Sequence, residues 1–407
     1  MLDSQRGASN GYRSITWINA NVAERREAKY NRYPVWAPRF WHGMRFGDWF
    51  GLLIRNRFRI HPFRLPTAFA ITLFTAFNSI LFQVQRLIYG RRIARTEIKP
   101  APIFILGHWR SGTTFLHELM IRDKRFSFSN SLHCFAPSHF LFTGWFFTHL
   151  GGFLLPKQRP TDNMATGWLR PQEDEFGLLA MGASSPYLRI AFPNHPAPDT
   201  CLLDMVDVPE KKLRKWKRTL KRFMQLLTFQ SPRRLVLKSP PHTGRLGLLK
   251  ELFPDACFIH LVRSPYEVFP STRRLWKSLD QVQGMQVPKH RELDDYVLSS
   301  LERMYDSFEA ARELVPDNQI IDIRYEELVS DPIATLRSIY DHFGIADFDS
   351  VVDQLTTYCD QQKNYQPNQY HLEQEDEEKV HLRWGKYFEC YGYSRPTVAD
   401  SSTSEDE

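Results

Sequence analysis

A short apolar run, a loop with two spaced glycines and a helical pattern follow one another between residues 103 and 120. Residues 103–106 are all apolar, which is typical of a parallel strand that is buried on both faces. Gly107 and Gly112 are separated by four residues, and the helical pattern begins directly after the second glycine. Such a turn directs backbone N–H groups and a helix N-terminus at one point, so it predicts a site for an anion such as phosphate or sulfate.

The loop has the glycine spacing of a P-loop but lacks the P-loop lysine. A loop that binds ATP or GTP continues with Lys and then Ser or Thr, because the lysine bridges the terminal phosphates and the hydroxyl holds magnesium. Here Thr113 stands at the lysine position, and the cation of the loop is Arg110. The sequence therefore keeps the anion site without the residue most diagnostic of nucleoside triphosphate chemistry.

Strand and helix patterns alternate through the rest of the chain. Apolar runs at 235–237 and 257–262 predict buried strands, separated by a helix near 245–252. Later elements are predicted at 294–314, 319–323 and 333–343. Strand, helix and strand in this order favour a right-handed parallel crossover, so we expect a three-layer α/β domain with a parallel sheet over residues 101–395.

Residues 1–100 are rich in arginine and aromatic residues and are predicted to form an N-terminal helical extension. Within it, residues 65–85 carry no charge and have about the length that a bilayer span needs. Three interpretations stay open: a helix packed on the core, a helix lying in a membrane interface, and a true membrane span. At the other end, residues 396–407 are predicted to be an acidic disordered tail.

Composition narrows the ligand class and the compartment. The net charge of +7 is modest for 407 residues, and no Lys/Arg-rich run with interleaved aromatics indicates a nucleic-acid surface. The five cysteines are scattered without metal-ligand spacing, so we expect reduced thiols and no metal site. The first residues lack the basic-then-apolar plan of a signal peptide. We therefore expect a cytoplasmic protein that binds a small anion and no nucleic acid, with peripheral contact to the inner face of the membrane as an open alternative.

A second candidate anion site follows the predicted strand 257–262. Arg263 comes directly after this strand, and Ser271 lies eight residues further on. Open α/β sheets bind ligands at the carboxyl ends of their strands, and a serine two helical turns later can reach the same anion.

These motifs together resemble those of the sulfotransferases that use 3′-phosphoadenosine 5′-phosphosulfate (PAPS), most closely their large bacterial branch, with its P-loop-like fold. The resemblance implies that the 5′-phosphosulfate is bound by Arg110, Ser111, Gly112, Thr113, Thr114 and Phe115. It also implies that Arg263 and Ser271 bind the 3′-phosphate, which distinguishes PAPS from ATP. Tyr325, in a Tyr-Glu-Glu stretch typical of the family, is expected to approach the nucleotide.

Sulfuryl transfer to a hydroxyl needs cations where the leaving oxygen gains charge and a base where the acceptor loses its proton. We assign Arg110 to the leaving side. Lys238 directly follows the strand 235–237 and is predicted to emerge at the same sheet edge as the loop. It matches a lysine with which several branches of the family stabilise the transferring group, so we predict the same role here.

The resemblance does not identify the general base. Where some branches carry a glutamate, residues 131–134 read Ser-Leu-His-Cys. The acidic stretch 173–175 offers Glu173 and Glu175 as the preferred candidates, because crowding and partial burial can raise the pKa of a carboxyl group. His133 and His139 are the alternative.

We therefore expect a metal-independent enzyme that transfers the sulfuryl group of PAPS to a hydroxyl of a small, hydrophobic or lipid-like acceptor. Its products would be a sulfate ester and adenosine 3′,5′-bisphosphate. A P-loop kinase and a non-catalytic, membrane-associated nucleotide-binding protein are the alternatives. The sequence leaves the oligomeric state and the identity of the acceptor open.

Overall fold

The computed structural model describes residues 33–34, 37–156, 166–194, 200–362 and 372–395. The predicted tail, 396–407, and the first 32 residues lie outside these ranges. From Asn31 onward the chain forms one compact unit, so the helices before residue 100 belong to the same unit as the sheet. The division into an extension, a domain and a tail stays a prediction.

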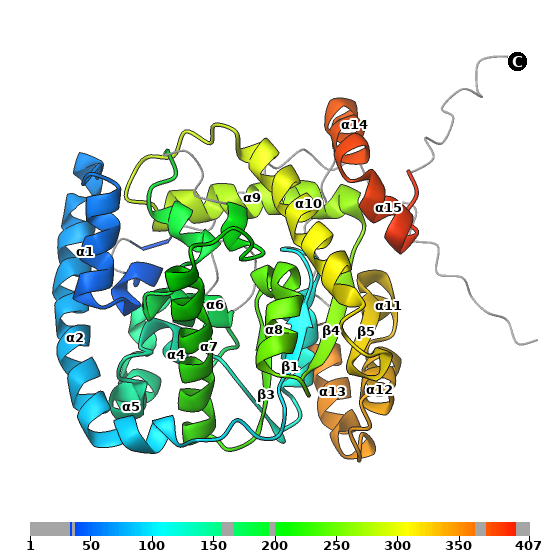
Figure 1. Cartoon of the computed structure of the whole chain (residues 1–407), viewed down its shortest axis with the longest axis horizontal. Coiled ribbons are helices and arrows are strands. Elements are labelled where there is room, and N and C mark those ends of the chain that lie inside the picture. Colours follow the sequence, from blue (N-terminus) through cyan, green and yellow to red (C-terminus); the bar gives the residue numbers. More distant parts are fainter. Residues whose placement is uncertain (1–32, 35–36, 157–165, 195–199, 363–371, 396–407) are drawn as a thin grey trace, which may run out of the picture. The chain divides into compact units, whose positions relative to one another are not determined.

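A parallel sheet of five strands, in the order β2-β3-β1-β4-β5, lies at the centre of this unit (Figure 1). The strands are β1 Ile103–Leu106, β2 Phe126–Phe128, β3 Arg234–Lys238, β4 Cys257–Val262 and β5 Ile320–Arg324. This confirms the expected α/β class and four of the strands. The short edge strand β2 was not predicted, because three residues with a central serine give too little pattern.

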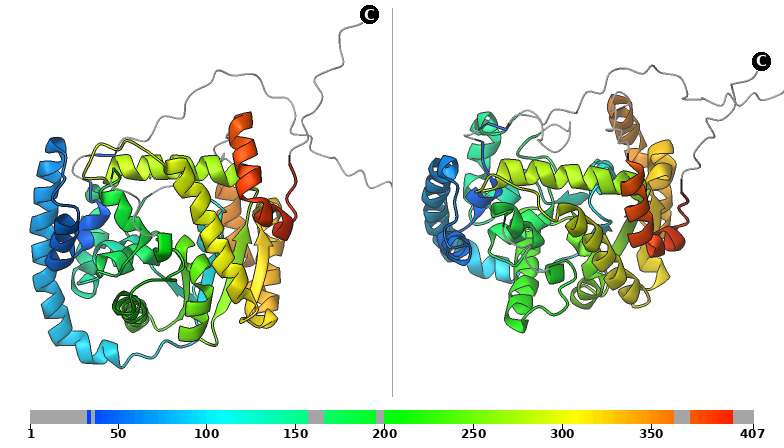
Figure 2. Two further views of the ribbon diagram at one scale, coloured as in Figure 1. Left: turned by 45° about the horizontal axis from the view of Figure 1, so that its top comes forward. Right: turned by 90° about the horizontal axis from the view of Figure 1, so that it is seen from above.

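The helices of the described residues are α1 Phe46–Arg55, α2 Leu65–Ala94, α3 Thr113–Met120, α4 Ser131–Phe135, α5 Phe140–Leu150, α6 Asp174–Ala180, α7 Glu210–Gln230, α8 Leu246–Leu252, α9 Pro265–Gln283, α10 Leu293–Arg312, α11 Tyr325–Ser330, α12 Pro332–His342, α13 Asp349–Gln362, α14 Gln374–Arg383 and α15 Gly385–Tyr391. Figures 1 and 2 show α1 and α2 side by side, away from α14 and α15.

Alternate residues of β1 enter two different cores. Phe104 and Leu106 pack with residues of α7, α8, α9 and α10, whereas Ile103 and Ile105 pack with residues of α3, α12 and α13. This follows from the period of two along a strand, and it explains why a strand covered on both faces is apolar throughout. The three layers place the loop after β1 at the carboxyl edge of the sheet, next to the ends of β3 and β4.

Helix α2 extends beyond the predicted apolar stretch and turns its polar side toward the rest of the unit. Asn78 is buried, and its amide donates hydrogen bonds to the carbonyl oxygens of His42 and Met44, at 2.6 and 3.0 Å. Its apolar side chains are mostly exposed. By length and composition alone, this helix is able to cross a membrane. The structure therefore differs from a helix whose apolar side is packed on the core.

Candidate active site

The loop between β1 and α3 contains three residues with positive φ: 140° at Gly107, 70° at Arg110 and 98° at Gly112. A Cβ atom on Gly107 would lie 2.5 Å from the carbonyl oxygen of Leu261, and one on Gly112 would lie 2.2 Å from the ring of Tyr325. Both positions therefore require glycine for space as well as for conformation. The left-handed backbone at Arg110 is uncommon for a side chain of this size and is typical of a functional loop.

The two predicted anion motifs meet at this loop. The Nε atom of Arg110 donates a hydrogen bond to Ser271 Oγ at 2.8 Å, and Nη1 of Arg263 donates to the backbone oxygen of Arg110 at 3.0 Å. The Arg263 guanidinium also lies over the ring of Tyr325, 4.1 Å from its centroid. The fold thus brings together Arg110 of the loop, Arg263 after β4, Ser271 of α9 and Tyr325 at the start of α11. In the sequence, 161 residues separate Arg110 from Ser271.

The remaining predicted loop residues lie around this point. Ser111 Oγ donates to the carbonyl oxygen of His108 at 2.8 Å, so its hydroxyl holds the loop itself. Thr113 is buried in the first turn of α3, and Phe115 packs on the core at that face of the sheet. Thr114 Oγ1 lies 3.4 Å from the ammonium group of Lys238.

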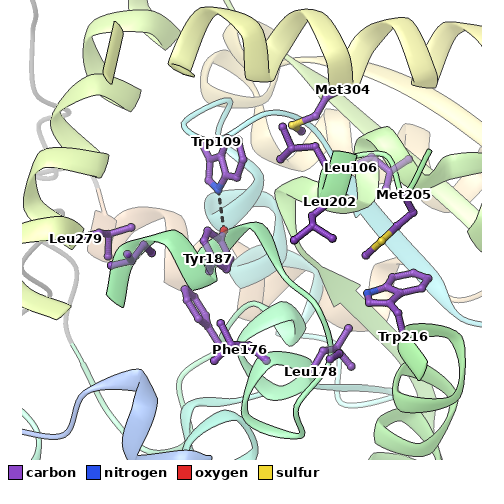
Figure 3. Close-up of a cluster of buried hydrophobic side chains, with 14 of the residues drawn as sticks. Leu106, Trp109, Phe176, Leu178, Tyr187, Leu202, Met205, Trp216, Leu279 and Met304 are labelled. Carbon is purple, nitrogen blue, oxygen red and sulfur yellow. Dashed lines mark hydrogen bonds between the residues drawn. The ribbon is translucent and has the colours of Figure 1, made fainter. Parts of the chain in front are cut away.

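Lys238 at the end of β3 faces the acidic stretch. Its ammonium group donates to Glu173 Oε1 at 2.9 Å, and the two side chains are 4% and 15% exposed. The other carboxylate oxygen of Glu173 accepts a hydrogen bond from the hydroxyl of Tyr187, which itself accepts one from Trp109 Nε1 at 2.7 Å (Figure 3). A continuous chain of hydrogen bonds therefore joins the anion loop, through Trp109, to Glu173 and Lys238.

Tyr187 is held rigidly as a hydrogen-bond donor. It is buried in the 3₁₀ helix Pro186–Ala191, and its ring stacks on Phe176 with 4.7 Å between centroids. Burial, and then the negative charge of Glu173, raise the pKa of the tyrosine well above its usual value. The hydroxyl therefore stays protonated and fixes the direction of the Glu173 carboxylate.

The next two acids point elsewhere. Asp174 accepts hydrogen bonds from Ser239 Oγ at 2.9 Å and from His242 Nε2 at 2.7 Å. Burial alone would raise the pKa of this carboxyl group, but the charge and hydrogen bond of His242 and the hydrogen bond of Ser239 lower it. Glu175 forms a fully buried, bidentate ion pair with Arg245, at 2.7 and 3.1 Å. Of the two predicted base candidates, the structure places only Glu173 beside Lys238.

The two alternative histidines bond to residues of other elements. His133 Nε2 donates to Gln230 Oε1 at 2.7 Å, and His139 Nε2 donates to Asn78 Oδ1 at 3.0 Å. Burial lowers the pKa of each imidazole to about 4. The structure therefore brings neither of them into the chain of hydrogen bonds that ends at Lys238.

Two features of the site had no signal in the sequence. Trp109 and Tyr187 are 78 residues apart, and no local pattern predicts their hydrogen bond.

All five cysteines are free. Within the described ranges, no group of three or more His, Cys, Asp or Glu side chains is arranged to hold a metal ion.

Comparison with known proteins defines the class. The sequence model described as the sulfotransferase family matches residues 102–350. The chain is 42% identical over 375 residues to the omega-hydroxy-beta-dihydromenaquinone-9 sulfotransferase Stf3 of Mycobacterium tuberculosis, covering 92% of this chain and 96% of that protein. A protein of the same name from Mycobacterium bovis matches to the same extent. The chain belongs to the sulfotransferase family and is a sulfotransferase enzyme, so we set aside the kinase and the non-catalytic alternatives.

Two solved structures share the fold. The sulfotransferase STF1 from Mycobacterium tuberculosis has a TM-score of 0.61 and 21% identity, covering 84% of this chain and 92% of that chain. The sulfotransferase STF9 from Mycobacterium avium also has a TM-score of 0.61, with 19% identity, covering 82% of this chain and 87% of that chain. These likenesses confirm the predicted fold.

Proposed function

We propose that the protein transfers the sulfuryl group of PAPS to a hydroxyl group of a lipid-like acceptor. The observation that carries this proposal is the contact between the two anion motifs, in which Arg110 bonds to Ser271 and Arg263 bonds to Arg110. A nucleotide with charged groups at both its 5′ and 3′ positions needs two neighbouring cationic sites. ATP has no 3′-phosphate and would leave Arg263 of the second site paired, among the described residues, only with Glu267.

The atoms of the site fit such a nucleotide. Arg263 Nη2 pairs with Glu267, whereas its buried Nε has no hydrogen-bond partner among the described residues. Gly107 and Gly112 let the loop approach Leu261 and Tyr325 closely, which fixes its backbone beside the second site. Tyr325 is the first residue of α11. Its ring lies beside Gly112 of the loop and packs against the guanidinium group of Arg263 at the second site. PAPS, when bound, would supply the sulfuryl group and an adenosine 3′,5′-bisphosphate leaving group.

We assign the remaining catalytic roles to three residues of the chain. Glu173, held between Tyr187 and Lys238, is the proposed general base that accepts the proton of the acceptor hydroxyl. Lys238 lies between Glu173 and Thr114 of the loop, where its ammonium group stabilises negative charge on the transferring group. Arg110 stabilises the leaving oxygen. We no longer propose Glu175 as a base, because its carboxylate is bound to Arg245.

The proposed acceptor is a lipid-like alcohol. The Mycobacterium tuberculosis relative is named for a hydroxylated dihydromenaquinone, and this supports an acceptor of the same class. We further propose that the enzyme works on the cytoplasmic side of a membrane. The free cysteines support a reducing compartment, and the exposed apolar side of α2 supports contact with lipid.

Transfer from radiolabelled PAPS to a panel of alcohols tests this proposal. We expect incorporation into hydroxylated isoprenoid quinones and no incorporation into hydrophilic sugars. Calorimetry in parallel should give tight binding of adenosine 3′,5′-bisphosphate with or without magnesium. Tighter binding of ATP would contradict the assignment of the donor, and transfer to sugars alone would contradict the assignment of the acceptor.

A further inference from the structure

Helix α2 has the opposite polarity to that of a helix on a water-facing surface. Its inward side chains include Thr75, Asn78 and Gln85, which are all buried. An apolar face runs along its outer side and consists of the exposed residues Leu65, Phe69, Leu73, Phe77, Ile80, Val84, Leu87 and Ile88. A surface helix in water normally turns its charged residues outward, and a continuous exposed apolar patch marks a site of interaction with lipid or protein.

A cationic cavity lies beside the second half of this helix. Its volume is about 290 Å³, and it is lined by Arg45, Arg86, Lys215, Arg218 and Arg222, together with Gln85. Asp48, outside the lining, pairs with Arg45 at 2.8 Å and with Lys215 at 3.3 Å. In the part of the chain that the structure describes, no carboxylate lies within 4.0 Å of the guanidinium groups of Arg86, Arg218 or Arg222.

Gln85, which lines the cavity, has a buried polar atom that the protein does not satisfy. Gln85 is 4% exposed, and its amide oxygen has no hydrogen-bond partner among the described residues. Buried polar groups in folded proteins are nearly always hydrogen-bonded, so an unpaired one beside three uncompensated cations indicates a site that a ligand completes. The uncompensated charges of Arg86, Arg218 and Arg222 therefore favour an anionic ligand.

The apolar face and the cavity share helix α2. Gln85 and Arg86 line the cavity, and their neighbours Val84 and Leu87 belong to the apolar face. Apolar and cationic groups side by side match the boundary of a bilayer, where acyl chains meet phosphates. A second copy of this chain fits less well, because pairing the cavity with itself would bring its cations together.

We propose that the cavity binds the headgroup phosphate of an anionic phospholipid while the apolar face of α2 lies in the same leaflet. The protein would thus dock on an anionic bilayer as a peripheral protein. The docking site is connected to the proposed base through α6, a helix roughly 10 Å long. Glu173 precedes its first turn, whereas Met181 at its other end lines the cavity and accepts a hydrogen bond from Arg45 at 2.8 Å. A docked lipid surface would therefore lie one short helix away from the site of transfer.

Cosedimentation of the full chain with vesicles tests the docking without any sulfuryl donor, so its result is independent of the proposed reaction. We expect binding to vesicles that contain phosphatidylglycerol to be roughly tenfold tighter, or more, than binding to phosphatidylcholine alone. Arg86→Gln, Arg218→Gln and Arg222→Gln combined should remove this preference. The matched control, Lys211→Gln, Lys212→Gln and Arg214→Gln, removes the same charge from exposed positions of α7 outside the cavity and should keep it.

A second pair of variants, one test and one control, examines the apolar face. Phe69→Ser, Leu73→Ser and Phe77→Ser should weaken binding to both kinds of vesicle, whereas Leu314→Ser, Val329→Ser and Leu382→Ser, which change equally exposed residues elsewhere, should not. Circular dichroism and melting temperatures establish that each variant is folded. Equal losses in the cavity variant and its charge control would overturn the proposal. So would binding of inorganic phosphate or glycerol 1-phosphate in the cavity without any preference for anionic vesicles.

Discussion

Glu173→Gln removes the negative charge that faces Lys238 and keeps one oxygen, which can still accept from Lys238, while its NH2 group takes the place of the oxygen that accepts from Tyr187. If Glu173 is the base, turnover should fall by roughly 10²- to 10⁴-fold, the usual contribution of general base catalysis. The stability cost should be about 1–3 kcal/mol, because the hydrogen bond from Lys238 loses its charge assistance and the one from Tyr187 loses its acceptor.

Glu175→Gln is the matched control, since it makes the same chemical change two residues away. Here the partner is Arg245, both side chains are fully buried, and the arginine charge would lose its counter-charge. Breaking such a pair costs about 3–5 kcal/mol, so we expect a clear drop in the free energy of unfolding. Turnover per folded molecule should stay close to that of the native enzyme.

Urea denaturation followed by circular dichroism gives the stability of both variants, and initial rates with radiolabelled PAPS give turnover per folded molecule. The two carboxylates should separate: Glu173→Gln mainly lowers the rate, and Glu175→Gln mainly lowers the stability. Near-native turnover in folded Glu173→Gln, or an equal loss of rate in both variants, would refute the assignment of the base.

Three further predictions concern the anion sites and the buried histidines. Arg263→Ala should weaken binding of adenosine 3′,5′-bisphosphate by about 2 kcal/mol, roughly thirtyfold, and hardly change binding of adenosine 5′-phosphosulfate; calorimetry showing equal losses would contradict a 3′-phosphate site. Gly112→Ala should lower the melting temperature and the affinity for the bisphosphate. The new methyl group would lie 2.2 Å from the Tyr325 ring, and residue 112 has a φ of 98°, which alanine rarely adopts. An unchanged melting curve would mean that the loop adapts without strain. Stability should also fall between about pH 6.5 and pH 4, by up to about 1.4 kcal/mol per pH unit for each of four histidines whose pKa is lowered, since the unfolded chain binds protons that the folded chain excludes. These histidines are His42, His108, His133 and His139, with pKa values of about 4, 3, 4 and 4. Constant unfolding midpoints across this pH range would show that these imidazoles are protonated in the folded protein.

The sequence predicted the parts of the molecule that rest on local patterns. The glycine loop after β1 and the arginine after β4 each lie at the carboxyl end of a buried strand, and parallel strands bring such ends to one edge. The meeting of Arg110, Ser271 and Arg263 therefore followed from the fold class. The hydrogen bond between Trp109 and Tyr187 did not, because it depends on how a 3₁₀ turn packs against a distant loop.

The acidic stretch shows why the base was ambiguous in the sequence. Glu173 has an extended backbone, with φ −64° and ψ 125°, and precedes α6, whereas Glu175 lies within its first turn. Residues two positions apart on a helix point to nearly opposite sides, so a small shift in where the helix begins exchanges their surroundings. Helix ends are uncertain by one or two residues in any sequence-based assignment, and here that uncertainty decides which carboxylate reaches Lys238.

Helix α2 presented a related difficulty. Hydropathy reports how apolar a segment is, but not which of its sides faces the protein. Asn78 donates hydrogen bonds to the backbone oxygens of His42 and Met44, which are 36 and 34 residues away in the sequence. These bonds hold the polar side of the helix against the protein. Only the packed structure determines that the apolar side chains are the exposed ones.

Arg110 has a consequence for how the donor site can change over evolution. Its side chain bonds to Ser271, and its backbone oxygen is bonded by Arg263, so one residue is held by both members of the second motif. Replacing Arg263 would remove the hydrogen bond to the loop backbone, and replacing Ser271 would remove the one that holds the Arg110 side chain. We therefore expect the three positions to vary together among related sequences, so that a relative that has lost one of them has lost or replaced the others.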